Sequence, residues 1–339
     1  MAITEDAPPG AEAGPAGGPS APEGRRLSSP LVLTLTLLLA VLAQSPIRGL
    51  LGTPLMQSWM TVFVAVTVQA LPFLVLGVLL SAAIAVFVPP SFFARALPRR
   101  PALAVPVAGV AGAILPGCEC ASVPVAGALV RRGVTPAAAL AFLLSAPAIN
   151  PIVLTATAVA FPRNPAMVLA RFLASLLVAC AMGWLWQRVG RTDWLRPPAH
   201  GAHEGATKGE AFWHSVRHDT VHAGGFLVLG AMAAATLKAA TPADWLRTAA
   251  GNPVFSVLAL AVLAVLLSIC SEADAFVAAS LTQFSLTAKL VFLVVGPMID
   301  LKLFAMQAGT FGRTFALRFA PATFALAIAG ALVTGTVLL

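Results

Sequence analysis

The stretch FLLSAPAIN at residues 142–150 returns in altered form as FLVVGPMID at residues 292–300. The two stretches place Asn150 and Asp300 at equivalent positions. Further matches follow in the same order: FLVLG at 73–77 with 226–230, Glu119 with Glu272, and ARF at 170–172 with LRF at 317–319. Collinear matches of this kind indicate an internal duplication.

The composition predicts a membrane protein. Of the 339 residues 59% are hydrophobic and only 10% are charged, whereas soluble domains are about a quarter charged. Several apolar stretches reach the roughly 20 residues that a spanning helix needs. Since the helix satisfies its own backbone in lipid, we expect an all-α polytopic fold. The net charge of +8 fits basic loops on an anionic lipid surface, so no nucleic-acid partner is expected.

We expect two homologous halves, one extra N-terminal helix and about seven to nine membrane spans. The expected organisation is a disordered tail over 1–26, an N-terminal transmembrane helix and loop over 27–59, a first permease-like repeat over 60–190, a cytoplasmic His-containing linker over 191–213, and a second repeat over 214–339. Each repeat contains four apolar segments, and the second of these is interrupted, at Pro116–Gly117 in the first half and at the polar run CSEAD (270–274) in the second.

Loop charges favour a re-entrant course for that second segment. With the N-terminus on the cytoplasmic side, a re-entrant segment leaves 13 basic loop residues inside and 5 outside, while a fully crossing segment gives 9 and 9. The re-entrant course gives three crossings per half, so the halves would be inverted repeats in the cytoplasmic membrane. Inverted repeats with broken helices are typical of transporters.

Four carboxylates lie inside apolar segments: Glu119, Glu272, Asp274 and Asp300. A carboxylate at membrane depth costs at least about 2.5–3.5 kcal/mol and commonly marks a transport pathway. Because the duplication relates some of these residues, we expect one shared substrate site where the halves meet. Its predicted members are Cys118, Glu119, Cys120, Asn150, Cys270, Ser271, Glu272, Asp274 and Asp300.

Helix-breaking residues surround these polar groups. The predicted breaks are at Pro116, Gly117, Pro147, Pro151 and Pro297. The prolines lack a backbone donor, which frees carbonyl groups that can line a cavity. Lys302 follows closely and could neutralise Asp300 or Asp274, or form only a structural ion pair.

The thiols suggest a soft ligand. Cys118 and Cys120 flank Glu119, and Cys270 belongs to the equivalent segment of the second half. Thiolates bind soft ions such as Zn(II), Cu(I) or trivalent metalloids, so these cysteines with Glu119 and Glu272 are candidate metal ligands. The cysteines could instead be small packing residues, and the carboxylates could carry coupling protons.

Three histidines form a second candidate. His214, His218 and His222 recur every four residues, which places them on one helix face. A cytoplasmic metal-collecting patch or an ordinary polar linker are the two alternatives.

The motifs resemble the YraQ and ArsP-like predicted permeases, a family that includes organoarsenical efflux permeases. The residues that carry the resemblance are PGCECASVPVAGAL at 116–129, SAPAINP at 145–151, CSEADAFVAASL at 270–281 and GPMIDLKLF at 296–304. Family members commonly have Ser between the two cysteines, where this chain has Glu119. The carboxylate favours a cationic or proton-coupled substrate. The resemblance also implies that some members act beside a small membrane protein.

These features together predict a secondary transporter for a small soft-metal, metalloid or related thiophilic solute, and not an enzyme. The alternatives are a zinc-type divalent metal permease subunit acting with a partner protein, and an intramembrane thiol-redox enzyme. No cofactor is expected, the lipid bilayer is an expected partner, and a homo-oligomer is left open.

Overall fold

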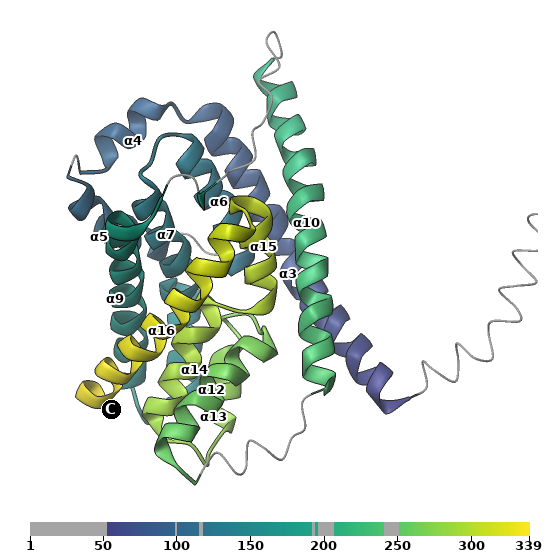
Figure 1. Cartoon of the computed structure of the whole chain (residues 1–339), viewed down its shortest axis with the longest axis vertical. Helices are drawn as coiled ribbons and strands as arrows, with labels where there is room; N and C mark the ends of the chain where they lie inside the picture. Colours follow the sequence, from purple (N-terminus) through teal and green to yellow (C-terminus); the bar gives the residue numbers. More distant parts are fainter. Residues whose placement is uncertain (1–52, 99, 115–117, 192–193, 196–206, 241–250) are drawn as a thin grey trace, which may run out of the picture. The chain divides into compact units, whose positions relative to one another are not determined.

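Helices account for every regular element that the structure describes. The structure is a computed structural model, and it describes residues 53–339 except 99, 115–117, 192–193, 196–206 and 241–250 (Figure 1). The predicted tail and first helix lie outside the described residues, as do the predicted breaks at Pro116 and Gly117. The all-α fold expected from the composition is confirmed.

Six helices of the first half have counterparts in the same order in the second half. The helices of the first half are α3 (Pro54–Phe87), α4 (Pro90–Ala96), α5 (Pro101–Ala111), the 3-10 turn η1 (Gly112–Ile114), α6 (Glu119–Arg131), α7 (Pro136–Ile149), α8 (Pro151–Ala160) and α9 (Ala166–Val189). Those of the second half are α10 (Lys208–Ala240), α12 (Pro253–Leu267), α13 (Asp274–Ser280), α14 (Leu286–Met298), α15 (Leu301–Phe311) and α16 (Arg313–Leu338). The helix α4 and the turn η1 have no counterpart among the described residues. The helix α10 begins at Lys208, so the last residues of the expected linker are helical.

Six stretches of the described residues are long and apolar enough to cross a membrane. They are α3, α7 with α8, α9, α10, α14 with α15, and α16. The chain is therefore a polytopic membrane protein, and the described part holds six of the seven to nine expected spans.

Proline starts many of the helices. The missing N–H and fixed backbone angle of proline suit the first helical position, and the prolines found there are Pro54, Pro90, Pro101, Pro136, Pro151 and Pro253. Pro147 and Pro297 stand inside the last turns of α7 and α14, so these helices end shortly after the prolines that were expected to break them.

The second segment of each half is made of short helices. The 11 residues of α5 and the 15 of α12 give lengths of about 17 and 23 Å at 1.5 Å per residue. Both fall short of the roughly 30 Å hydrocarbon core. Each is followed by an interruption and a second short helix, α6 or α13. No continuous helix crosses here, which is the geometry that a re-entrant segment needs.

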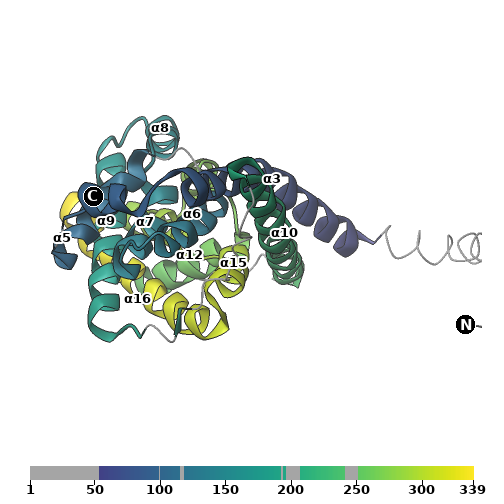
Figure 2. The ribbon, with the colours of Figure 1, turned by 90° about the horizontal axis from the view of Figure 1, so that it is seen from above.

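The helices of the two halves also pack against one another in corresponding ways. The helix α7 packs against α5 and α9, and α14 packs correspondingly against α12 and α16. The equivalent helices α3 and α10 pack side by side (Figures 1 and 2). In Figure 1, α3 climbs from its N-terminal end toward α4, whereas α10 descends from the opposite end, so these two helices run in opposite directions. Opposite directions are what inverted repeats require.

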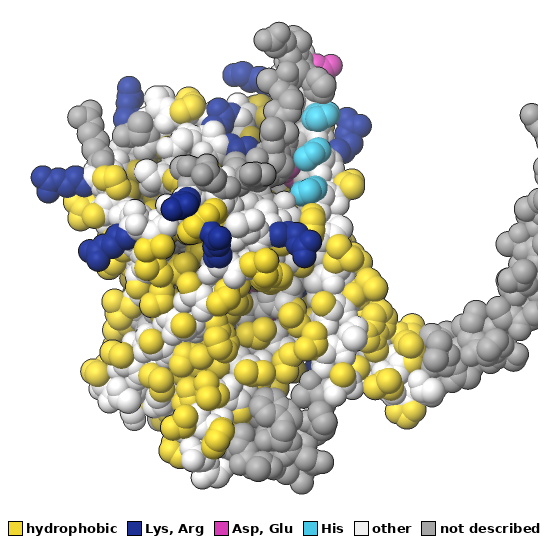
Figure 3. All heavy atoms as spheres, in the orientation of Figure 1, with side chains coloured by type: hydrophobic (Ala, Val, Ile, Leu, Met, Phe, Trp, Pro, Cys, Tyr) yellow, Lys and Arg dark blue, Asp and Glu magenta, His cyan; other side chains and the backbone are white. Residues whose placement is uncertain are grey.

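The broken helices form the centre of this helical unit. In the spans α7–α8 and α14–α15, 83% and 78% of the residues in the most apolar window are buried, against 33% in α3 and in α10. On the face seen in Figure 3, hydrophobic side chains cover much of the surface, and Lys and Arg gather toward the end where α10 begins. The outer helices therefore present the apolar face that lipid would contact.

Two equivalent glycines allow the outer helices to approach the central ones. A Cβ on Gly77 of α3 would collide with the Cα of Ala121 in α6, and a Cβ on Gly230 of α10 would collide with the Cα of Lys302 in α15. Only glycine fits such backbone contacts. Both contacts fix short helices that lead into the central polar cluster described next.

Candidate functional site

Four short helices begin at predicted site residues. Glu119 is the first residue of α6 and Asp274 the first of α13, while Asn150 and Asp300 are the N-caps of α8 and α15. All four side chains are buried. The N-terminus of a helix carries a positive partial charge, so each start can stabilise an oxygen or carboxylate next to it.

Asn150 and Asp300 perform the same local task in the two halves. The Asn150 Oδ1 accepts a hydrogen bond from the Val153 N–H at 3.0 Å, and the Asp300 Oδ1 accepts one from the Leu303 N–H at 2.6 Å. Each cap satisfies a backbone donor that the interruption would leave without a partner. The interruptions are thus built from capping side chains at equivalent positions.

Three thiols meet beside Glu119. The ligand atoms of Cys118, Glu119 and Cys120 all lie within 4.8 Å of one another, and all three residues are buried. The Cys118 thiol also interacts with the thiol of Cys270 from the second half. None of the cysteines is in a disulfide. This set of sulfurs with one carboxylate suits a soft cation.

Lys302 connects this thiol cluster to Asp300. Its Nζ lies 2.5 Å from the Oε1 of Glu119 and 3.6 Å from the Oδ2 of Asp300, and it donates a hydrogen bond to the Ser268 carbonyl at 3.1 Å. Ser268 is the left-handed C-cap of α12. Lys302 is only 1% exposed, so its charge is balanced inside the protein.

Arg171 is a central residue that the sequence interpretation missed. From α9 it donates hydrogen bonds to the Oδ1 and Oδ2 of Asp274 at 2.9 and 2.8 Å, to the Thr157 hydroxyl at 2.9 Å and to the Ser271 carbonyl at 3.3 Å. Two parallel bonds from one guanidinium hold a carboxylate in a fixed orientation. Asp274 therefore pairs with Arg171, and Lys302 pairs with Glu119 and Asp300.

Several oxygens of the cluster accept no hydrogen bond from the described residues. They are the Oε2 of Glu119, the Oε1 of Glu272, the Oγ of Ser271 and the Oδ2 of Asp300. Glu272 is partly buried and lies within electrostatic range of Glu119 and Lys302. Buried polar atoms without partners call for water, a proton or an ion. The described cluster has four carboxyl groups and two cationic side chains, so its net formal charge is −2 when every carboxyl group is ionised, and Glu272 is the carboxyl group without an ion pair to a described residue.

The histidines lie elsewhere. His218 and His222 belong to α10, where the His218 Nδ1 lies 3.3 Å from Asp219 and the His222 Nε2 lies 3.1 Å from the Gly309 carbonyl. Asp219 is 3.9 Å from Arg131, at the end of α6 opposite to Glu119. His214 is exposed. His218 therefore lies near the end of α6 that is remote from Cys118, Glu119 and Cys120.

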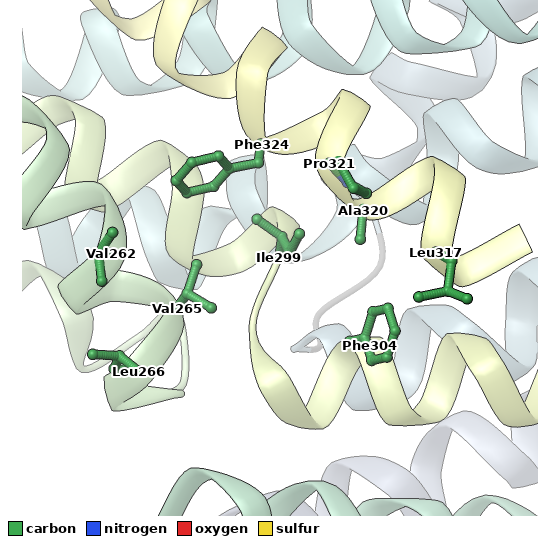
Figure 4. Close-up of a pocket in the computed structure, with 9 residues that line it drawn as sticks. All are labelled: Val262, Val265, Leu266, Ile299, Phe304, Leu317, Ala320, Pro321 and Phe324. Carbon is green, nitrogen blue, oxygen red and sulfur yellow. The ribbon is translucent and has the colours of Figure 1, made fainter. Parts of the chain in front are cut away.

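A separate cavity lacks side chains that could bind a polar solute. A hollow of about 300 Å³ lies between α12, α15 and α16. Its lining includes Val265, Ile299 and Phe324, which are labelled in Figure 4. The lining side chains are apolar, and two of them, Val262 and Leu317, are well exposed at the surface. This hollow suits lipid better than a polar solute.

Comparisons with known proteins agree on one family. A profile of the ArsP_1 family, described as "Predicted permease", matches residues 55–336. The "UPF0718 protein YcgR" of Bacillus subtilis (strain 168) is 34% identical over 279 residues, which cover 80% of this chain and 95% of that protein. A protein of Streptococcus mutans serotype c (strain ATCC 700610 / UA159), named "Putative two-component membrane permease complex subunit", is 31% identical over 284 residues, 81% of this chain and 94% of the relative. No solved structure matches the chain.

Proposed function

This chain belongs to the ArsP_1 family of predicted permeases, as its motifs had indicated, and on that premise we propose that it carries a small thiophilic solute across the cytoplasmic membrane. The solute class is a soft metal ion or a trivalent metalloid. The family description and the name of the Streptococcus relative favour a transporter over the thiol-redox enzyme.

One observation carries the proposal: buried thiols from both halves meet beside a carboxylate at the interruption of the central helices. Cys118 and Cys120 come from the start of α6, and Cys270 comes from the segment before α13. A soft ion bound by these sulfurs would be held by both repeats at once. Since thiolates and not thiols are the ligands, binding would release protons.

Glu119 favours a cation over a neutral solute. Its second oxygen, Oε2, accepts no hydrogen bond from the described residues, although the first is paired with Lys302. A cation next to the thiols could use this oxygen and would offset the excess negative charge of the cluster. A neutral metalloid would use the sulfurs alone.

The two halves differ in a way that supports alternating access. The helix α10 covers α15, where Gly230 contacts Lys302 and Phe226 contacts Gly309. The equivalent residues of α8 are Ile152 and Val159, and they are 47% and 63% exposed. Among the described residues, α3 makes no comparable contact with α8.

Exchanging the roles of the two halves gives a second arrangement. In it α3 would cover α8, and α10 would cover α13, while α6 and α15 would be released. The duplication supports this proposal, because the second arrangement would use helix contacts that correspond to those of the first. Movement of α3 and α10 between the two arrangements would open the central site to each side of the membrane in turn.

A second subunit is part of the proposal. The Streptococcus relative is named as a subunit of a two-component complex. We extend this to a small membrane partner of the present chain, which co-purification from the native membrane would identify. A homo-oligomer stays a prediction.

Transport assays on the purified full chain test the solute class. Proteoliposomes are loaded in turn with Zn²⁺, Cd²⁺, arsenite or phenylarsine oxide, and the flux is measured by elemental analysis. We expect flux of at least one of them, and we expect Cys118→Ser, Cys120→Ser and Cys270→Ser each to reduce it at least tenfold. Cys180→Ser is the matched control, because Cys180 is a buried cysteine of α9 outside the cluster. Equal flux in all four variants, or no flux of any solute, would refute the proposal.

A further inference from the structure

We propose that the ammonium group of Lys302 is a built-in substitute cation, which occupies part of the solute site while the solute is absent. The inference rests on the proposed function, since it concerns how the same site is emptied. It adds a specificity-determining residue that pairs with the site carboxylates only when no solute cation does.

The surroundings of the ammonium have the composition of a cation site. Its neighbours are oxygens of Glu119, Asp300 and Ser268, from three separate points of the chain. The Ser268 carbonyl stands at the C-terminal end of α12, where the helix carries a negative partial charge that favours cations. Two carboxylates and a helix-end carbonyl are hard oxygen ligands, and the thiols of Cys120 and Cys270 lie within electrostatic range of the same ammonium.

The other cations of the described interior cannot take this role. Arg171 is committed to Asp274 through two hydrogen bonds. Lys289 is buried near the start of α14 and makes no ion pair with a described residue. Lys302 is therefore the cationic side chain, among the described residues, that neutralises Glu119 and Asp300.

The side chain can move while its backbone stays fixed. The close contact with Gly230 holds the Lys302 Cα against α10, whereas the ammonium is at the end of a flexible four-carbon stem. A cation that binds the sulfurs and Glu119 would repel the ammonium from this position. When the cation leaves, the ammonium would return, so that the charge of the site stays nearly constant and the empty protein can rearrange.

Binding of Cd²⁺ to the purified full chain tests the role of Lys302. Removing a competing cation should strengthen binding, so Lys302→Met is expected to bind Cd²⁺ at least tenfold more tightly than the wild type. The cadmium–thiolate charge-transfer absorption reports the binding, and thermal unfolding reports folding. Lys289→Met is the matched control and should bind as the wild type does. Unchanged or weaker binding by Lys302→Met would overturn the inference, as would the absence of Cd²⁺ binding in every variant.

A second variant covers the case in which Lys302→Met does not fold. Lys302→Met with Asp300→Asn removes one positive and one negative charge, so the charge of the cluster is that of the wild type. Glu119 is still freed from its partner, and tighter Cd²⁺ binding than in the wild type is again expected. Binding no tighter than wild type in this folded double variant would also overturn the inference.

The same titrations in a background with Cys118, Cys120 and Cys270 replaced by serine separate the two proposals, with thermal stabilisation by Cd²⁺ as the readout. If Lys302→Met still strengthens Cd²⁺ binding in the serine background, the substitute-cation role of Lys302 is supported and the proposal of a thiophilic solute is refuted. If wild-type binding needs the thiols but Lys302→Met does not strengthen it, the thiophilic solute holds and the substitute-cation role fails.

Discussion

Gly77 and Gly230 occupy equivalent positions in the two halves, yet they contact non-equivalent helices. Gly77 packs on Ala121 of α6, which follows the first interruption of its half, whereas Gly230 packs on Lys302 of α15, which follows the second. A duplicated protein with twofold-related packing would give both glycines equivalent partners. The difference shows that the two halves are packed asymmetrically in the described structure, which is the observation behind the proposed second arrangement.

Cross-linking can detect the second arrangement. Phe226 contacts Gly309 in the described structure, and the equivalent pair is Phe73 with Val159. In membranes we expect disulfides in both the Phe226→Cys/Gly309→Cys and the Phe73→Cys/Val159→Cys proteins, because each pair is close in one arrangement. Added solute should change the ratio of the two yields. A Phe73→Cys/Val159→Cys protein that never cross-links, while the other pair does, would rule out the exchange of roles.

The glycine contacts predict a sharp difference between neighbouring glycines of α10. Gly230→Val would force the side chain into the backbone at Lys302, and overpacking of this kind costs about 1–3 kcal/mol or more. Gly225→Ala meets no atom within 4 Å, so we expect it to be neutral or slightly stabilising. Thermal unfolding of the detergent-purified proteins measures both. Equal effects would show that the close approach of α10 and α15 is wrong.

The buried pair of Arg171 and Asp274 predicts a large loss of stability when it is broken. Arg171→Met leaves a buried carboxylate without its partner, and such a loss costs about 3–5 kcal/mol. The double variant Arg171→Met/Asp274→Asn should recover part of this. Arg318 is the repeat equivalent and stacks on Trp194 at 4.0 Å, so Arg318→Met should cost about 0.5–1 kcal/mol. Similar losses for the two arginines in unfolding experiments would contradict the assignment.

Asp300 caps the helix α15 and also carries a negative charge, and substitutions can distinguish these two roles. Asp300→Asn keeps a side-chain oxygen for the Leu303 N–H, as Asn150 does for α8, so we expect nearly unchanged stability but altered solute flux. Asn150→Ala removes a cap without a charge and should cost about 0.5–2 kcal/mol. Solute flux and thermal unfolding, measured on the same preparations, test both expectations. An unfolded Asp300→Asn protein would show that the charge and not the cap is structural.

Labelling from one side tests the re-entrant segment. Arg95 precedes α5, and Arg132 follows α6. If the segment enters and returns, cysteines at these two positions react with an impermeant maleimide from the same side. Arg163→Cys, between α8 and α9, should react from the other side. Labelling of positions 95 and 132 from opposite sides would mean that the segment crosses fully.

The sequence was sufficient to predict an all-helical polytopic membrane protein, and it also singled out buried polar residues that the structure places near one another. The repeat predicted the paired interruptions, and the rarity of charge in apolar segments singled out Glu119, Asp274 and Asp300. Arg171 meets the same criterion, because it is a charged residue in an apolar segment, although it lies far in sequence from the polar motifs. Its pairing with Asp274 could not be foreseen, since the contact depends on how α9 packs against the start of α13.

The asymmetry between the halves lies beyond any sequence argument. Ile152 and Lys302 are equivalent in the repeat, but one is half-exposed and the other buried. The repeat treats these two positions alike, and only coordinates show which of the two is covered by an outer helix.

The central claim is that thiols from both halves bind one solute ion, and X-ray absorption at the cadmium edge tests it most directly. For the Cd²⁺-loaded wild type we expect sulfur ligands from both repeats, and the number of Cd–S bonds should fall in Cys270→Ser as it does in Cys118→Ser. Cadmium surrounded only by oxygen and nitrogen, or a spectrum that the loss of Cys270 leaves unchanged, would contradict the claim.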